Sequence, residues 1–227
     1  MSTAPWPPER ALLYHFTHVD NLSAILGSKR LVADSVARES GLVTDVGDRD
    51  VKASRRARAV PIPPGGVVAD YVPFYFAPQS PMMFRIACDH RDAVTGRYPG
   101  GDDPLVYLMT SVDLLGPLGA AWIATDGNAA SSVTEFTSTS AALRDMIDWP
   151  LMEATYWHNI PEDPDRQRRR MAELLVHREF PIELIRGIAT RTPSRERDVR
   201  RVLTTHGLGD LYVGVRPAWY YGYERRR

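Results

Sequence analysis

The residues around Glu173 suggest a catalytic or binding role for its carboxylate. This glutamate interrupts an apolar run, MAELLV, over residues 171–176. An unpaired carboxylate is costly to bury, so the run leaves two interpretations open. Glu173 either faces water on an edge strand, or it lies in a cleft where it binds a hydroxyl or stabilises positive charge.

Two further groups of polar residues stand out. His15 falls on a predicted strand with Leu13 and Thr17 on the same face. Taken alone, it is better explained as a core histidine bonded to backbone groups than as a ligand contact. The second group is a basic cluster, Lys52, Arg55, Arg56 and Arg58. A solvated loop face explains that cluster as well as a phosphate site does, so neither signal is specific by itself.

Several common site types are absent from the sequence. It contains no Gly-x-Gly-x-x-Gly, Walker A, Gly-x-Ser-x-Gly or His-Glu-x-x-His pattern. Cys88 is the only cysteine, which excludes an internal disulfide and a cysteine-based zinc site. We therefore expect no metal, and chemistry from isolated polar residues that the fold brings together.

The bulk composition favours a cytoplasmic protein with no membrane segment. Lys plus Arg and Asp plus Glu both number 28, so the net charge is zero and gives no global attraction to nucleic acid. No apolar run approaches the ~20 residues that cross a bilayer, and the first residues have no secretory pattern.

Hydrophobic periodicity predicts an α+β fold. Strands are expected at 11–17, 71–77, 104–111, 120–125, 171–177, 185–190 and 211–215. A short helix should end at Gly27, a helical turn is expected at 82–87, and helices at 141–147 and from Pro193. Residues 162–170 read as a charged turn or helix, and 132–140 as an exposed loop. Residues 33–66 have no sustained periodicity and are expected to be a loop with at most one short helix, around the arginines. Short strands and helices alternate without a βαβ rhythm.

In this order, several segments resemble the DarT family of DNA ADP-ribosyltransferase toxins. They are YHFTHVDNL at 14–22, RRAR at 55–58 followed by VP, DYVPFYFAP at 70–78 followed by SPM at 80–82, and the block from YW at 156–157 through AELLV at 172–176 to FP at 180–181. Their order and spacing match the family over nearly the whole chain.

The resemblance implies a small split-sheet ADP-ribosyltransferase fold, with flanking helices and substrate loops, in a single domain over residues 1–227. It implies transfer of ADP-ribose from NAD⁺, bound in the central cleft, to a thymine base of single-stranded DNA. It also implies a toxin whose partner is a macrodomain antitoxin (DarG-like).

The same resemblance supplies site residues. It assigns catalysis to Glu173 and Arg56. It assigns NAD⁺ contacts to His15, Thr17, Asn21, Tyr75 and Met82. We expect nucleic-acid contacts from Arg55, Arg58 and Asn128, in the irregular segments 33–66 and 126–140.

The expected chemistry agrees with these residue types. Breaking the nicotinamide–ribose bond builds positive charge on the ribose, which a carboxylate near the 2′-hydroxyl stabilises. Arginine has too high a pKa to act as a base, so Arg56 would stabilise deprotonated thymine or hold phosphate. Single-stranded DNA avoids the cost of unpairing the base.

The sequence departs from the family pattern at Met171, where a glutamine is usual, at Leu174, where an aromatic is usual, and at Asn128, where a histidine can occur. These departures bear on the preferred DNA sequence. The alternatives are a related ADP-ribosyl- or phosphotransferase acting on RNA or protein, and a binding module without catalysis. The second predicts loss of the carboxylate, which is present.

Overall fold

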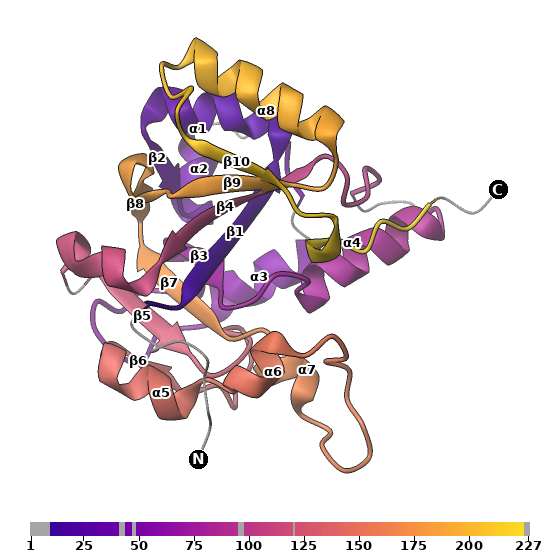
Figure 1. Ribbon diagram of the computed structural model, residues 1–227. Coiled ribbons are helices and arrows are strands. Elements are labelled where there is room, and N and C mark those ends of the chain that lie inside the picture. Colours follow the sequence, from indigo (N-terminus) through magenta and orange to yellow (C-terminus); the bar gives the residue numbers. More distant parts are fainter. Residues whose placement is uncertain (1–9, 41–43, 47–48, 95–97, 120, 225–227) are drawn as a thin grey trace.

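The computed structural model describes residues 10–40, 44–46, 49–94, 98–119 and 121–224. These residues form one eight-stranded sheet in the order β10-β9-β4-β1-β3-β7-β5-β6, with flanking helices (Figure 1). The strands are β1 (Leu12–His18), β3 (Tyr71–Tyr75), β4 (Leu105–Ser111), β5 (Trp122–Thr125), β6 (Phe136–Thr137), β7 (Glu173–His177), β9 (Gly187–Thr190) and β10 (Tyr212–Val215). A separate two-stranded sheet joins β2 (Arg30–Val32) to β8 (Glu179–Pro181).

The large sheet is split near its middle. β1 pairs with β4 over its full length, from Leu12↔Ser111 to His18↔Leu105. On its other side, β1 pairs with β3 at Tyr14↔Tyr75, the one aligned pair between these two described strands. Beyond Tyr14 the strands diverge, so the sheet consists of two halves joined at this pair. This is the split sheet that the family resemblance implied.

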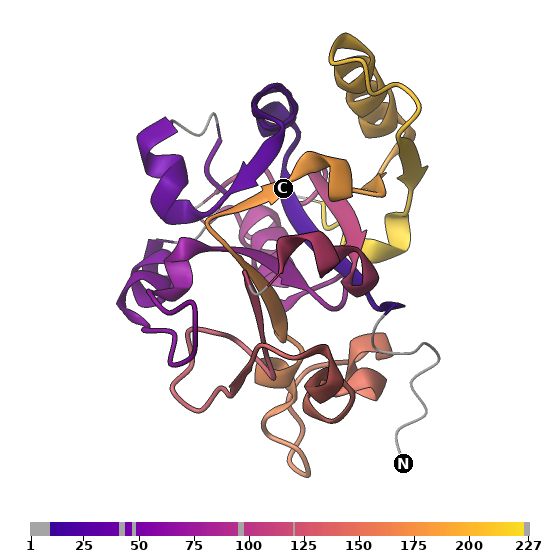
Figure 2. The same cartoon turned by 90° about the vertical axis from the view of Figure 1, so that its left-hand side faces the viewer.

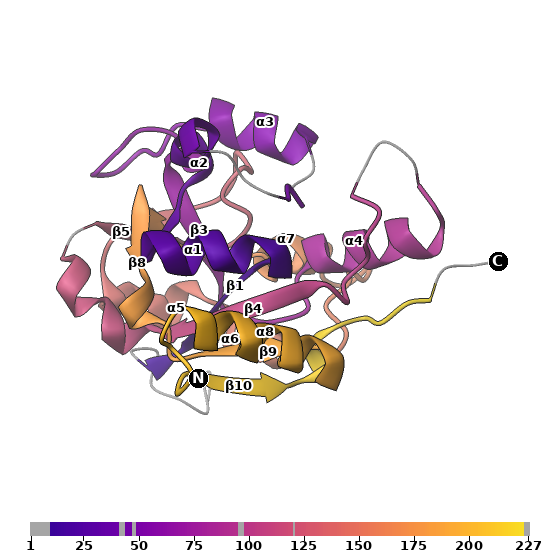
Figure 3. The same cartoon turned by 90° about the horizontal axis from the view of Figure 1, so that it is seen from above.

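The two faces of the sheet carry different side chains because neighbouring residues of a strand point to opposite faces. On β1 and β4 one face is aliphatic and is covered by α1 (Leu22–Ser28) and α8 (Pro193–Thr205), which pack on residues such as Leu13 and Leu108. The other carries the aromatic residues Tyr14 and Phe16 and is covered by α4 (Pro81–Arg91). Figures 2 and 3 show α8 and the helices α2 and α3 on opposite sides of the molecule.

Local signals begin these helices. The Thr192 side chain accepts a hydrogen bond from the backbone N–H of Arg195, and Pro193 occupies the first turn of α8, as predicted. Ser80 caps α4 in the same way, and Pro81 follows it. The helix is therefore longer than the single turn expected at 82–87. The α1 helix ends where Lys29 adopts the left-handed conformation, two residues after Gly27.

The expectation for residues 33–66 was wrong. This segment contains two helices, α2 (Asp34–Ser40) and α3 (Arg49–Ala57), rather than at most one. The reason is that ion pairs stabilise these helices in place of an apolar stripe. Lys52 Nζ lies 2.9 Å from Asp34 Oδ1 and 2.8 Å from Asp45, and Arg56 also bonds Asp34. Apolar periodicity does not reveal such contacts.

The connection from β5 to β7 holds the remaining elements. It contains β6, which interrupts the loop expected at 132–140, then α5 (Leu143–Met146), α6 (Trp149–Glu153) and α7 (Arg166–Arg169). This connection ends directly before Glu173, the first residue of β7. None of the helices in the described ranges is long and apolar enough to cross a membrane.

Candidate active site

Glu173 lies in the interior of the sheet, between β3 and β5, and is 0% exposed. The alternative of a water-facing glutamate on an edge strand is therefore excluded. The Cα partner of Glu173 is Tyr75, whose Cα partner is Tyr14. Because directly opposed residues of antiparallel strands share a face, these three side chains form one row across the sheet.

The Glu173 carboxylate is paired with a buried guanidinium. Arg55 Nη1, from α3, donates to Glu173 Oε1 at 3.1 Å and to Oε2 at 2.8 Å. The backbone N–H of Ala129 donates to Oε1 at 3.3 Å. Burial is the largest single effect on the pKa of Arg55 and lowers it, but the charge of Glu173, the hydrogen bond to Glu173 and the other nearby groups together hold that pKa above its ordinary value. The pair satisfies the requirement that buried charges be compensated.

The second terminal nitrogen of the Arg55 guanidinium is available to a ligand. Its Nη2 atom is buried and has no hydrogen-bond partner among the residues that the structure describes. A buried polar group without a partner is unfavourable, and such groups are found where a ligand supplies the acceptor. This donor belongs to the same guanidinium that contacts Glu173, so the pair has the geometry to bind an electronegative atom.

Tyr75 and Met82 lie beside this pair. The Tyr75 hydroxyl donates to Met82 Sδ at 3.8 Å, and its ring stacks on Phe16 with the centroids 6.2 Å apart. Burial, and after it the charge of Glu173, raises the pKa of the Tyr75 hydroxyl far above its ordinary value. Tyr75 is therefore a neutral phenol, and it provides an aromatic and weakly polar wall next to the carboxylate.

His15 bridges the split in the sheet. Its Nδ1 lies 2.8 Å from the backbone oxygen of Pro73 on β3, so the backbone bond expected of a core histidine is present. Burial lowers the pKa of His15, although the bond to Pro73 opposes this shift. The ring is therefore neutral. Because a carbonyl oxygen only accepts, Nδ1 carries the proton and Nε2 is left as an acceptor.

Thr17 and Asn21 hold the segment that leads into α3. Asn21 Nδ2 donates to Thr17 Oγ1 at 3.2 Å and to the backbone oxygen of Thr44 at 2.8 Å. The N–H of Thr44 returns a bond to Asn21 Oδ1 at 2.8 Å. Strand alternation places His15 and Thr17 on the face opposite Tyr14. His15 and Thr17 lie on β1 and on one face of the sheet. Tyr75 and Glu173 lie across the split, on β3 and β7, and on the other face.

Arg56 does not meet Glu173. Its Nε and Nη2 atoms donate to Asp34 Oδ2 at 3.1 and 2.7 Å. Lys52 and Arg56 are four residues apart and share the helix face that meets Asp34. Arg55 precedes Arg56 by one residue, so its side chain is rotated by about 100° around the helix axis. Arg55 therefore points to the Glu173 carboxylate rather than to Asp34.

The remaining predicted residues flank the site. Arg58 Nη2 donates to the Ser132 backbone oxygen at 3.4 Å, and its guanidinium lies 5.8 Å from the centre of the Phe136 ring. Asn128 directly precedes Ala129, and its side-chain oxygen accepts from the N–H of Ala130 at 3.0 Å. Asn128 therefore belongs to the turn that holds the Glu173 carboxylate, and Arg58 contacts the residues that follow this turn.

Sequence reasoning missed three arginines that hold the β5–β7 connection. Arg168 bonds Asp126 at 2.9 Å, and Arg169 bonds Asp148 and Asp163. The buried Arg170 donates to four backbone oxygens, those of Pro78, Leu151, Met152 and Ala154. The available signal was a run of arginines immediately before the conspicuous glutamate. Within the described residues, no group of three or more His, Cys, Asp or Glu side chains could hold a metal.

Comparison with known proteins places this geometry in a family. The family model described as "ssDNA thymidine ADP-ribosyltransferase, DarT" matches residues 14–221. A DNA ADP-ribosyl transferase of Mycobacterium tuberculosis is 36% identical over 217 residues, covering 94% of this chain and 90% of that protein. The solved structure of Thermus sp. 2.9 DarT in complex with ADP-ribosylated ssDNA superposes with a TM-score of 0.83 at 32% identity, covering 94% of this chain and 98% of the other. The NAD⁺ complex of the same Thermus protein gives a TM-score of 0.79 at 32% identity, covering 95% and 100%.

The chain has a split sheet with a buried glutamate, and these solved structures match it over most of its length. Together these findings define an NAD⁺-dependent ADP-ribosyltransferase. More narrowly, the chain belongs to the DarT family of single-stranded-DNA thymidine ADP-ribosyltransferases. The α+β fold class and the family resemblance predicted from the sequence are confirmed.

Proposed function

We propose that this protein transfers ADP-ribose from NAD⁺ to a thymine base in single-stranded DNA, and that residues 1–227 act as one domain in doing so. The observation that carries the proposal is the buried Glu173–Arg55 pair, which lies beside Tyr75 at the split of the sheet. The Thermus structures with NAD⁺ and with ADP-ribosylated ssDNA support the choice of both substrates.

Glu173 stabilises the transition state. As the bond from ribose C1′ to the nicotinamide nitrogen breaks, positive charge develops on the ribose and nicotinamide leaves as a neutral molecule. A fixed carboxylate at the 2′-hydroxyl favours that charge, and the burial of Glu173 strengthens this effect. The new bond joins C1′ to a thymine ring nitrogen, whose proton passes to solvent.

Arg55, rather than Arg56, takes the role of the catalytic arginine. Its contact with both oxygens of Glu173 supports this assignment, and its unpaired Nη2 donor suits a thymine that is losing its proton. Arginine stabilises the negative charge without acting as the base. Arg56 is a positioning residue that, through Asp34, sets the rotation of α3.

NAD⁺ occupies the split between β1 and β3. His15 Nε2 is free to accept from a ribose hydroxyl, and Tyr75 with Met82 lines the nicotinamide side. Thr17 and Asn21 shape the wall by holding Thr44. The proposed chemistry uses no metal, because nicotinamide already leaves from a cationic ring.

DNA contacts come from the turn around Asn128 and from the loop that carries Phe136. Arg58 offers a cation for phosphate, and the neighbouring Phe136 offers an aromatic ring for a base. Transfer to RNA or protein remains the alternative, because NAD⁺ chemistry alone does not choose the acceptor.

The test mixes the purified protein, NAD⁺ and EDTA with oligonucleotides that differ in a single thymine. Mass spectrometry should find an added ADP-ribose on the thymine-containing single strand, and none on its thymine-free match or with Glu173→Gln. An adduct on RNA or protein, with the DNA unchanged, would show that the acceptor is not DNA but that the protein is still an ADP-ribosyltransferase. No adduct on any acceptor would overturn the proposal.

The biological role we propose is that of a cytoplasmic toxin whose mark a macrodomain antitoxin removes. A Thermosipho africanus relative, 29% identical over 166 residues that cover 72% of this chain and 38% of that protein, is a fusion of a DNA ADP-ribosyl transferase with a DNA ADP-ribosyl glycohydrolase. Growth arrest on expression, reversed by a co-expressed macrodomain hydrolase and absent with Glu173→Gln, is the expected result. Unimpaired growth with active enzyme would refute the toxin role.

A further inference from the structure

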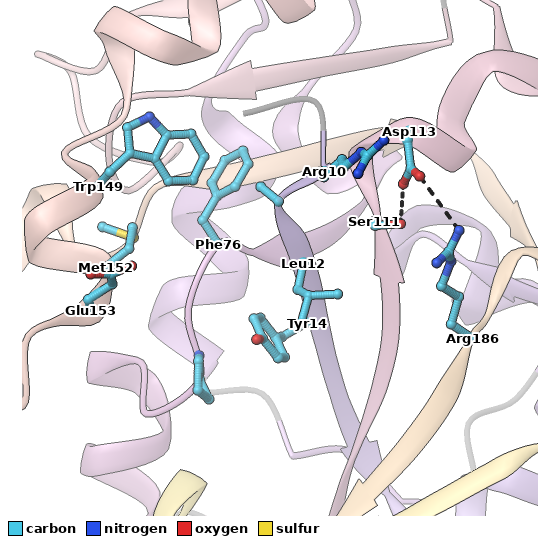
Figure 4. A pocket seen from close by; sticks show the side chains of 12 residues that line it. Arg10, Leu12, Tyr14, Phe76, Ser111, Asp113, Trp149, Met152, Glu153 and Arg186 are labelled. Atoms are coloured by element: carbon cyan, nitrogen blue, oxygen red, sulfur yellow. Dashed lines mark hydrogen bonds and ion pairs between the residues drawn. The ribbon is translucent and has the colours of Figure 1, made fainter. Parts of the chain in front are cut away.

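A cavity of about 550 Å³ lies beside the beginning of β1 (Figure 4). Trp149, Phe76 and Met152 line one side, and Leu12 and Tyr14 lie across from them. Arg10, Asp113 and Arg186 gather at the far end. The volume lies within the range of small-molecule sites, and no step of the proposed reaction uses this cavity.

The cavity adjoins the row that carries Glu173. Tyr14, in its wall, is the Cα partner of Tyr75, which is the Cα partner of Glu173. Neighbouring strands of a sheet are about 4.8 Å apart, so the Tyr14 backbone lies two strand spacings, or about 10 Å, from that of Glu173. A polymer with one unit at Glu173 can place a neighbouring unit in the cavity.

The cavity lies apart from the proposed NAD⁺ site. The split opens beyond Tyr14, toward His15 and Thr17, whereas Arg10, Ala11, Leu12 and Tyr14 line the cavity on the near side of the Tyr14–Tyr75 pair. Its opposite wall is α6, which belongs to the β5–β7 connection. Arg170 ties that helix to Pro78 and so fixes the wall relative to the strand that begins with Glu173.

The lining has the chemistry of a nucleotide site. The aromatic rings and the Met152 thioether suit the face of a planar base, which stacks on such groups regardless of sequence. The arginines at the far end suit a phosphate. Arg186 is only loosely held, 3.6 Å from the exposed Asp113, which also accepts a bond from Ser111. A purely apolar ligand would leave these charged groups unused.

We propose that this cavity is a subsite for the base of a nucleotide that flanks the modified thymine, with its phosphate toward Arg10 and Arg186. The inference rests on the proposed function and extends it, because it assigns a place in the fold to one neighbour of the modified thymine.

The test is abasic scanning of an oligonucleotide with a single thymine, in which each neighbour in turn loses its base. In the wild type, one position should lower kcat/KM by about tenfold, the effect of losing one stacked base. Leu12→Asp places a charge in the cavity wall at a residue that is 46% exposed, so the fold should tolerate it. This variant should lose about tenfold on intact DNA and nothing further when the base at that position is removed.

Val94→Asp is the matched control, because Val94 is 37% exposed and lies outside both sites. It should retain the wild-type profile, including the abasic penalty. Arg186→Ala should raise KM for DNA, leave kcat unchanged and lower the salt dependence of binding by about one phosphate contact.

The outcomes separate the two proposals. If the wild type modifies no thymine in DNA, the proposed function fails and the subsite fails with it. If it modifies thymine but no neighbour matters, or if the abasic penalty persists in Leu12→Asp, the subsite alone is overturned. A penalty in the wild type that disappears in Leu12→Asp supports the subsite.

Discussion

Replacing Arg55 by Met is the most direct test of the buried pair, because it removes one charge and keeps much of the side-chain volume. Arg55 is 14% exposed in its side chain and Glu173 is 0% exposed. Without Arg55, the bond from the Ala129 N–H is the one that the carboxylate keeps among the residues that the structure describes. Leaving one partner of a buried ion pair uncompensated costs about 3–5 kcal/mol of folding free energy.

The adjacent arginine supplies the control. Arg56 is 32% exposed and pairs with Asp34, which is itself 22% exposed and also bonded to Lys52. Pairs of that exposure contribute about 1 kcal/mol or less. Arg56→Met should therefore cost far less stability than Arg55→Met, although the two residues are neighbours on the same helix.

Urea unfolding at neutral pH measures both variants, and a double variant completes the cycle. Arg55→Met combined with Glu173→Met removes both charges and should recover most of the lost stability. At about 2–4 °C per kcal/mol for a chain of this size, Arg55→Met alone should lower Tm by roughly 10 °C. Equal losses for Arg55→Met and Arg56→Met, or a double variant less stable than Arg55→Met, would refute the reasoning.

Three further predictions follow from the site. Arg55→Ala should reduce DNA ADP-ribosylation at least tenfold more than Arg56→Ala, measured as kcat/KM with saturating NAD⁺; the reverse order would restore Arg56 to the catalytic role. Arg170→Met should raise KM for DNA more than KM for NAD⁺, because Arg170 holds the connection through four backbone oxygens, and equal changes in both KM values would contradict this. Burial lowers the pKa of His15 in the folded state, so its contribution to stability is full above the unfolded pKa of about 6.5 and is lost as pH falls below it. The unfolding free energy of the wild type should thus fall more than that of His15→Gln between pH 8 and pH 5, and parallel curves would show that His15 does not titrate in this way.

Much of the scaffold could be predicted from local patterns. Alternating apolar residues located β1, β4 and β7 to within two residues at each end, and Thr192-Pro193 marked the start of α8, because these signals act over a few residues. The segments around Tyr75 and Glu173 were distinctive enough to indicate the family. What the patterns lacked was any signal for α2, whose stabilising partner, Lys52, lies in the next helix along the chain.

The sequence by itself determined that a carboxylate lies at the start of an apolar strand, that arginines lie upstream of it, and that aromatic residues line the strands between. Tertiary structure alone decided that Glu173 is buried rather than at an edge, because the neighbours of β7 are β3 and β5, far apart in the chain. It also decided which arginine meets the carboxylate. Residues 55 and 56 are chemically identical, and contacts outside the helix, among them that of Asp34 with Lys52 and Arg56, give α3 the rotation that turns Arg55 toward Glu173. A side chain's direction on a polar helix depends on what the helix packs against, and that information is not local to the helix.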